Sequence, residues 1–227
     1  MTTPPVDLDR RARQSLGTSG DAIYAMVEAL VAERHGGGGV LVDVGCGTGT
    51  LCGRLRAQFA RCVGVDAVRY EGLDAAVEFL AHDLDQPRIP LPDAAAQVVT
   101  AVETIEHLEN PWAFVRELAR LAAPGGWVVV TTPNQLSVLS KTTLVLKNAF
   151  NAFQAASYPA HRTALLEIDL RRLVREAGLE QDTVRYSGEG RWPLTGMHYP
   201  RAAGRFWPRG CSDNVAIVAR KPAGGRR

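Results

Sequence analysis

The chain has 227 residues, of which 46% are hydrophobic and 22% are charged, and its formal net charge is +2. This composition is typical of a globular protein, so it excludes wholesale disorder and fibrous classes, and the near-zero charge argues against a protein that coats DNA. The charge is nevertheless uneven, because residues 1–160 hold 13 basic and 17 acidic side chains whereas residues 161–227 hold 13 and 7. The length fits one large domain or two small ones.

The N-terminal third begins with a segment of low apolar content. Residues 1–14 combine two prolines with alternating charges, which predicts a flexible arm and no signal peptide. Helical spacing of apolar residues predicts a helix over 21–34. A short β-branched run at 40–44 predicts a buried strand, and it leads directly into a glycine-rich loop, Gly45 to Gly49.

Strands and helices alternate along the rest of the chain. The pattern predicts helices at 51–59, 112–121 and 164–177, and strands at 62–65, 77–81, 98–102, 127–132, 183–186 and 215–219. Apolar strands that alternate with helices are typical of an α/β fold with a parallel sheet covered on both faces. Residues 136–161 interrupt this alternation, and we expect 223–227 to form a flexible tail.

The cysteines and the apolar runs bear on where the protein works. No two cysteines have the spacing of a zinc knuckle or a redox motif, which favours a reducing, cytoplasmic location; they are Cys46, Cys52, Cys62 and Cys211. No run of about 18 apolar residues is present, so no transmembrane helix is expected.

The glycine-rich loop predicts a ligand site, because glycines between a strand and a helix allow a ligand to approach the backbone closely. A dinucleotide-binding fingerprint would need a third glycine at position 50, which is Thr50. A phosphate-binding loop would need Gly-Lys followed by Ser or Thr, which is absent. Neither NAD nor ATP is therefore favoured.

The run from Val42 to Gly49 resembles motif I of the class I S-adenosylmethionine (SAM) dependent methyltransferases. The resemblance implies a Rossmann-like three-layer αβα sandwich with seven strands, mostly parallel, and an antiparallel last strand. It further implies one domain over 15–222, with 136–161 as a helical lid insertion. SAM would be the cofactor and S-adenosylhomocysteine the product.

The same resemblance places acidic residues at the ends of successive strands. Asp66 would accept hydrogen bonds from the ribose hydroxyls, while Asp83 would meet the adenine amino group and the backbone of Leu84 a ring nitrogen. The residues that it assigns to the cofactor are Asp43, Gly45, Cys46, Gly47, Gly49, Asp66, Ala67, Asp83, Leu84 and Glu103.

The segment Glu103 to Leu108 resembles the sequence that follows the fourth strand in many small-molecule methyltransferases, a group that includes the quinone-biosynthesis O-methyltransferases. Methyl transfer to a hydroxyl requires removal of its proton, and an imidazole, with an unperturbed pKa of about 6.5, suits that task. We therefore predict that His107 is the general base. An alternative, which is not favoured, makes Glu103, Glu106, His107 and His161 the ligands of a divalent metal.

The acceptor side is less defined by the sequence. The leading hypothesis is O-methylation of a small hydroxylated metabolite, and the Arg and aromatic residues of 191–209 suggest that it is planar or anionic. The insertion could act as a lid or touch a membrane surface peripherally. The alternatives are methylation of an RNA 3′-terminal 2′-hydroxyl, against which the acidic first 160 residues argue, and a SAM-binding protein without catalysis.

Overall fold

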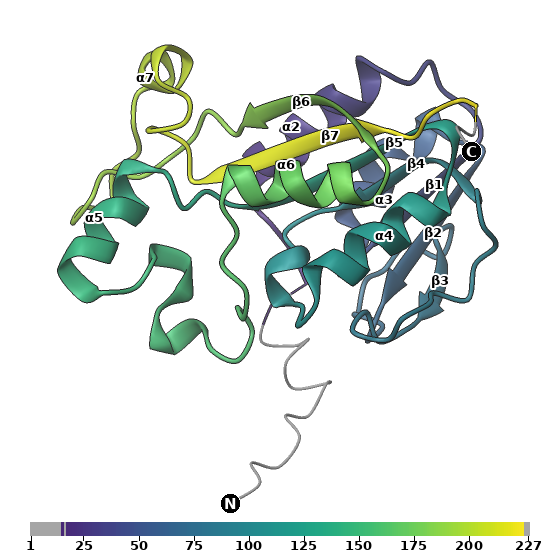
Figure 1. The fold of residues 1–227 in the computed structure, drawn as a ribbon, viewed down its shortest axis with the longest axis horizontal. Helices are drawn as coiled ribbons and strands as arrows, with labels where there is room; N and C mark the ends of the chain where they lie inside the picture. The colour runs from purple at the N-terminus through teal and green to yellow at the C-terminus, as the bar shows by residue number, and fades with distance from the viewer. Residues whose placement is uncertain (1–14, 16, 225–227) are drawn as a thin grey trace, which may run out of the picture.

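A seven-stranded sheet forms the middle layer of the molecule (Figure 1). The computed structural model describes residue 15 and residues 17–224, so the predicted arm at 1–14 and most of the predicted tail at 223–227 lie outside the described residues. The strands are β1 (Val40–Val44), β2 (Arg61–Asp66), β3 (Glu78–Ala81), β4 (Ala96–Ala101), β5 (Ala122–Pro133), β6 (Glu180–Tyr186) and β7 (Asn214–Arg220).

The strand order is β3-β2-β1-β4-β5-β7-β6. The first five strands pair in parallel, whereas β7 runs antiparallel to both β5 and β6. This confirms the Rossmann-like sheet with an antiparallel last strand. The order reverses between β1 and β4, which is the point where open α/β sheets form a crevice beyond the carboxyl ends of their strands.

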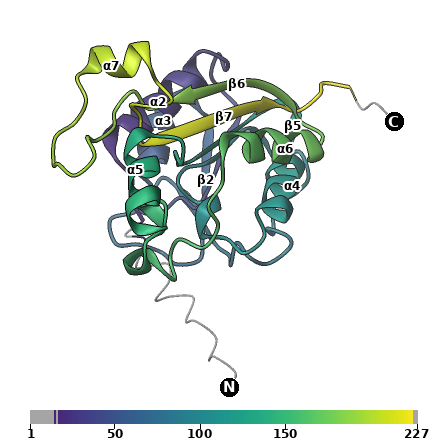
Figure 2. The same cartoon turned by 60° about the vertical axis from the view of Figure 1, so that its left-hand side comes forward.

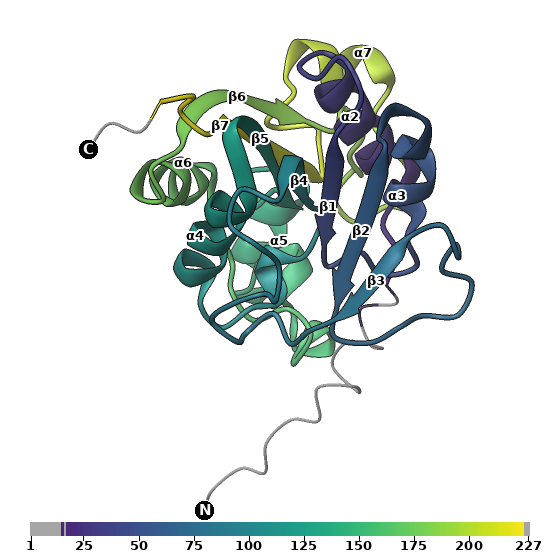
Figure 3. The ribbon, with the colours of Figure 1, turned by 90° about the vertical axis from the view of Figure 1, so that its right-hand side faces the viewer.

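Helices cover both faces of the sheet, as predicted (Figure 3). On one face lie α2 (Asp21–Ala32) and α3 (Thr50–Leu55), and on the other α4 (Pro111–Leu121) and α6 (Glu167–Glu176). Neighbouring residues of a strand point to opposite faces, so Leu41 packs in the core beside α2 and α3 while Val42 packs in the core beside α4 and α6. The two cores hold the strand ends in fixed positions.

Some helix bounds differ from the prediction. The helix expected at 51–59 is the short α3 followed by a 3-10 turn, η1 (Arg56–Gln58). The helix expected from residue 164 begins at Glu167, because the Asp169 side chain accepts the backbone N–H of Leu166 at 3.0 Å and caps the helix there.

Two segments project from the same end of the molecule (Figures 1 and 2). The insertion 136–161 contains α5 (Val138–Lys147) and two 3-10 turns, η3 (Asn151–Phe153) and η4 (Ala155–Ser157). The region between β6 and β7, for which the sequence pattern predicts no helix, contains a short one, α7 (Arg201–Phe206). Within the described part of the chain, no helix has the length and apolar character needed to cross a membrane.

Candidate functional site

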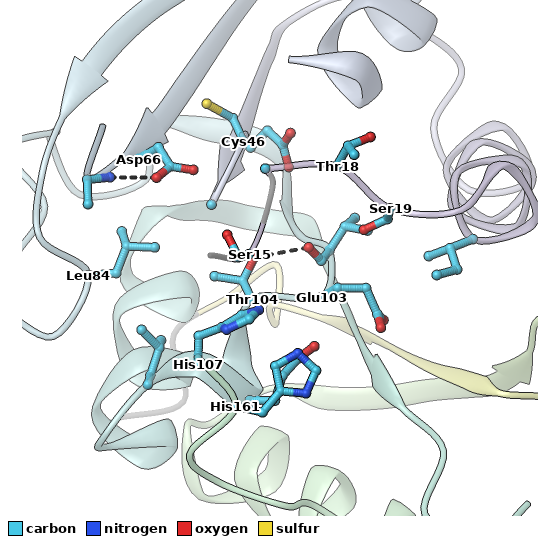
Figure 4. A pocket seen from close by; sticks show the side chains of 18 of the residues that line it. Ser15, Thr18, Ser19, Cys46, Asp66, Leu84, Glu103, Thr104, His107 and His161 are labelled. Atoms are coloured by element: carbon cyan, nitrogen blue, oxygen red, sulfur yellow. Dashed lines mark hydrogen bonds between the residues drawn. The ribbon is translucent and has the colours of Figure 1, made fainter. Parts of the chain in front are cut away.

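A cavity of about 330 Å³ opens beyond the carboxyl ends of β1, β2 and β4 (Figure 4). Pockets for small ligands in proteins start at about this size. Its walls come from the segment before α2, the loops after β1, β2, β3 and β4, and the end of the insertion. The lining residues are Ser15, Gly17, Thr18, Ser19, Gly20, Ile23, Tyr24, Asp43, Gly45, Cys46, Asp66, Ala67, Asp83, Leu84, Val102, Glu103, Thr104, Glu106, His107, Leu108 and His161.

The glycine-rich loop is packed against other parts of the chain. Gly45, Gly47 and Gly49 all have positive φ values, of 78°, 53° and 75°. A Cβ atom at Gly45 would overlap the Thr104 side chain, and one at Gly47 would overlap the carbonyl oxygen of Gly17. The protein backbone itself therefore excludes a side chain at position 47. Gly47 and Gly49 do not line the cavity.

The segment before α2 is held over this loop. The backbone N–H of Thr48 donates to the carbonyl oxygen of Gly17 at 2.8 Å, and the backbone N–H of Ser19 donates to the Tyr24 hydroxyl at 2.9 Å. The sequence gave no signal for Gly17, whose role depends on a contact with a residue 31 positions later.

Asp43 is buried at the end of β1 and its carboxylate is held by protein groups. Its two oxygens accept hydrogen bonds from the Thr100 hydroxyl at 2.7 Å and from the Cys52 thiol at 3.7 Å. Burial raises the pKa of Asp43 to about 6. Asp43 thus ties β1 to β4 at the floor of the cavity, and its contact with a cofactor stays a prediction.

Asp66 and Asp83 both line the cavity, as the sequence predicted. The Asp66 carboxylate accepts hydrogen bonds from the backbone N–H groups of Gly47 at 2.8 Å and Ala67 at 2.7 Å. Burial raises the pKa of Asp66, and these hydrogen bonds oppose that shift. The Asp83 carboxylate accepts the backbone N–H of Asp85 at 3.1 Å. Each carboxylate keeps lone pairs for a ligand, since an ionised carboxylate has about four acceptor positions.

Glu103 is fixed by the two strands that follow it in the sheet. Its backbone has a φ of 48°, and its carboxylate accepts hydrogen bonds from the Thr131 hydroxyl on β5 and the Asn214 amide on β7, both at 2.7 Å. Glu103 does not share a helical turn with Glu106 and His107, because the 3-10 turn η2 (Ile105–His107) begins after it. The sequence gave no hint of the support from Asn214.

His107 and His161 lie side by side in the cavity wall, with ring centroids 4.8 Å apart (Figure 4). The Nδ1 atom of His107 lies 2.9 Å from the carbonyl oxygen of Ala160, and that of His161 lies 2.7 Å from the carbonyl oxygen of Ala152. A carbonyl oxygen can only accept, so both Nδ1 atoms carry a proton, and a lone pair on either ring in its neutral form lies on Nε2. Burial and the neighbouring His107 lower the pKa of His161.

Glu106 lies beside the two imidazoles. One oxygen, Oε2, accepts the Thr132 hydroxyl at 3.1 Å, whereas Oε1 is buried without a hydrogen-bond partner among the described residues. Glu106 offers a carboxylate oxygen, and His107 and His161 each offer a ring nitrogen. These three atoms lie within 4.8 Å of one another. Burial raises the pKa of both Glu106 and Glu103, and each disfavours ionisation of the other.

This arrangement bears on the predicted metal site. One buried carboxylate oxygen without a partner and two imidazoles with Nε2 lone pairs form a donor set that suits Zn²⁺, Mn²⁺ or a similar divalent ion. Glu103 does not belong to this group, since Thr131 and Asn214 hold its carboxylate elsewhere. The residues present therefore fit a three-residue site better than the four-residue site that the sequence suggested.

The Arg and aromatic side chains of 191–209 do not line the cavity. Arg191 pairs with Asp213 at 2.6 Å and Arg209 with Glu167 at 2.6 Å, both outside it. Of the insertion 136–161 only His161 lines the cavity, so a function of this segment as a lid stays a prediction. A contribution of 191–209 to acceptor binding stays a prediction.

The fold and the cavity define an α/β protein with a pocket at the switch point of its sheet and with carboxylates at the end of β2 and after β3. A model of the methyltransferase domain family matches residues 21–184, which is more than half of the chain. The chain therefore belongs to the methyltransferase domain family, and its fold is that of the class I SAM-dependent methyltransferases.

Three similar proteins illustrate this membership. A ubiquinone biosynthesis O-methyltransferase of Bordetella pertussis is 33% identical over 108 residues, which cover 42% of this chain and 43% of that protein. One of the same name from Chromobacterium violaceum is 29% identical over 177 residues, covering 73% and 75%. A SAM-dependent methyltransferase structure from Archaeoglobus fulgidus superposes with a TM-score of 0.65 at 16% identity, covering 95% of this chain and 100% of that one. The chain thus aligns with less than half of the Bordetella protein.

We expect Gly47→Val to weaken SAM binding by about 100-fold or more, because a branched side chain at positive φ cannot coexist with the Gly17 carbonyl and the Asp66 hydrogen bond. Isothermal titration calorimetry with SAM measures this loss. Gly53→Ala is the matched control, since nothing lies near a Cβ atom there and alanine favours the helix α3. SAM affinity retained by Gly47→Val would contradict the role given to the loop.

Proposed function

We propose that the protein transfers a methyl group from SAM to a hydroxyl group of a small, uncharged molecule. The observation that carries this proposal is the orientation of His107. Its Nδ1–H is bonded to the Ala160 carbonyl, so the atom with the lone pair, Nε2, is the one that can take a proton. A general base in the same cavity as the cofactor-binding loops is what O-methylation needs.

The cofactor would lie along the loops after β1, β2 and β3. Asp66 would accept hydrogen bonds from the ribose hydroxyls and Asp83 from the adenine amino group, with Leu84 against the ring. The methyl group would then point toward η2 and His107. The sulfonium already carries the charge of a leaving group, so the protein needs chiefly to align the acceptor and exclude water.

The charge of the cavity wall supports an uncharged acceptor rather than the anionic one expected at first. Five carboxyl groups and two imidazoles line the described cavity, whereas no Lys or Arg does. A buried anion without a cationic partner is strongly disfavoured, and burial already raises the pKa of Glu103 and Glu106. The names of the relatives from Bordetella pertussis and Chromobacterium violaceum support O-methylation of a small molecule.

A metal-assisted reaction is the second candidate, and the buried, unpartnered Oε1 of Glu106 is the observation that favours it. Glu106, His107 and His161 would hold the ion, which would lower the pKa of an acceptor hydroxyl when bound. An RNA 3′ end is less compatible with this cavity, because its phosphates would face carboxyl groups. A protein that binds SAM without catalysis needs no general base, so the orientation of His107 would then serve no function.

We expect His107→Ala to lower kcat by about 10²-fold or more and to leave the Kd for SAM unchanged, because a general base does not hold the cofactor. Formation of S-adenosylhomocysteine gives the rate and calorimetry gives the Kd. His198→Ala, which alters a histidine outside the cavity, should leave both values as they are. If His107→Ala turns over at the normal rate, His107 is not the base.

A chelator together with His161→Ala separates the two candidate mechanisms. If His107 acts alone, we expect EDTA to leave the rate unchanged and His161→Ala to lower it less than about tenfold, since His161 then only packs against the base. A rate that EDTA abolishes and Zn²⁺ or Mn²⁺ restores would instead establish the metal site. Metal content measured by mass spectrometry provides an independent readout.

The acceptor's charge can be tested with matched pairs, such as the methyl ester of a dihydroxybenzoic acid and the free acid. We expect kcat/KM to be at least about tenfold higher for the ester, because the carboxylate would enter a cavity without a cation. Thr18→Arg places a cation on an exposed residue of the cavity wall and should lower the ratio of kcat/KM for the ester to kcat/KM for the acid. Gln181→Arg, on β6 and outside the cavity, should leave that ratio unchanged. Preference for the free acid in the unaltered protein would overturn the assignment.

A further inference from the structure

Two segments of the chain contain no acidic residue. Residues 118–166 and 190–212 lack both Asp and Glu, yet the second holds four arginines and the insertion within the first holds two lysines. Arg201 and Arg205 on α7 have no acidic partner within the described part of the chain. The surface built from the insertion and from 190–212 therefore carries a local positive charge on a protein of nearly zero net charge.

The beginning of the second segment is a defined hairpin. Arg191 pairs with His198 in an antiparallel bridge, the backbone N–H of Trp192 donates to the Met197 carbonyl at 2.9 Å, and the Trp192 and Tyr199 rings pack at 4.6 Å. This framework presents Leu194 at the tip, where its side chain is 83% exposed and its φ is 62°. A leucine in the left-handed region that is open to water has no structural benefit in the isolated protein.

Further apolar side chains are exposed on the neighbouring helices. Phe206 on α7 is 88% exposed, and Val145 near the end of α5 is 84% exposed, with Leu146 and Met197 also open to solvent. The Asn134 side chain donates to the Arg209 carbonyl, and the backbone N–H of Val138 donates to the Gly210 carbonyl, both at 2.8 Å. These hydrogen bonds tie the start of α5 to the end of the second segment, and both helices project from the same end of the molecule (Figure 2).

We propose that this apolar and basic surface, formed by α5, the hairpin 190–199 and α7, binds the surface of a membrane that contains anionic lipids. Exposed Leu194, Phe206 and Val145 would insert among the acyl chains, and the basic side chains would lie at the level of the phosphate groups. The inference rests on exposure and charge alone, so it does not depend on methyl transfer.

The composition of the surface favours a bilayer over a nucleic acid. The exposed apolar side chains of this surface are aliphatic or thioether at 145, 146, 194 and 197, and aromatic at 192, 206 and 207. Aromatic rings suit both stacked bases and a membrane interface, whereas the exposed aliphatic side chains can gain from acyl chains but cannot stack on bases. The described helices do not span a membrane, so attachment would be peripheral and reversible.

Sedimentation of the full-length protein with vesicles tests the proposal. We expect binding to vesicles of equal parts phosphatidylglycerol and phosphatidylcholine, and at least about tenfold weaker binding to phosphatidylcholine alone, because the basic residues then lose their counter-charge. High salt should weaken the first interaction. Leu194→Asn is informative, since asparagine accepts the left-handed conformation: it should lower vesicle binding about fivefold or more while Tm stays equal or rises.

Matched variants test whether vesicle binding needs this surface in particular, and not merely any exposed apolar or basic residue. Phe206→Ser and the pair Arg201→Gln with Arg205→Gln should each reduce vesicle binding. Two controls lie elsewhere and should not reduce vesicle binding. The first is Ile168→Ser, which changes an apolar residue 48% exposed on α6, and the second is the pair Arg116→Gln on α4 with Arg175→Gln on α6. The proposal would be overturned if the protein did not bind vesicles or if all variants bound them equally. It would also be overturned by preferential binding to a short RNA, or by a dimer in light scattering that Phe206→Ser dissociates.

Discussion

The site depends on the close approach of three chain segments at the glycine-rich loop. No Cβ atom fits at positions 45 or 47, because Thr104 from the loop after β4 and Gly17 from the segment before α2 occupy that space. The backbone N–H of Thr48 then meets the Gly17 carbonyl, and that of Gly47 meets Asp66. One steric requirement thus joins the first, second and fourth strand ends to the N-terminal wall, and it creates the cavity in which all the proposed chemistry takes place.

The insertion contributes the His161 side chain to this cavity, and its backbone orients both imidazoles. The carbonyl oxygens of Ala152 and Ala160 accept the Nδ1–H groups of His161 and His107, and so they determine which nitrogen of each ring can act as a base or a ligand. Second-layer hydrogen bonds of this kind fix the tautomer and orientation of a functional imidazole. A segment that looks peripheral in the fold therefore decides the chemistry of the site.

Charge divides the molecule in two. Carboxyl groups line the cavity, where they suit a cationic cofactor and oppose an anionic acceptor, while the basic surplus of the C-terminal third lies outside it. Part of that surplus is neutralised in pairs such as Arg209 with Glu167. Arg201 and Arg205 on α7 have no such partner among the described residues and lie on the helix that carries the exposed Phe206. The same charge asymmetry therefore underlies both the selectivity that we propose for the cavity and the membrane contact that we propose for the surface.

Local patterns in the sequence determined the sheet, its covering helices and the loops that carry Asp66, Asp83 and His107, because strand and helix periodicity and glycine spacing act over a few residues. Only the tertiary structure decided which groups meet. Asn214 supports Glu103 from 111 positions away and Ala160 orients His107 from 53 positions away. Arg191 and Arg209, which follow β6, pair outside the cavity instead of lining it. Such contacts depend on how whole elements pack, and no short-range pattern encodes them.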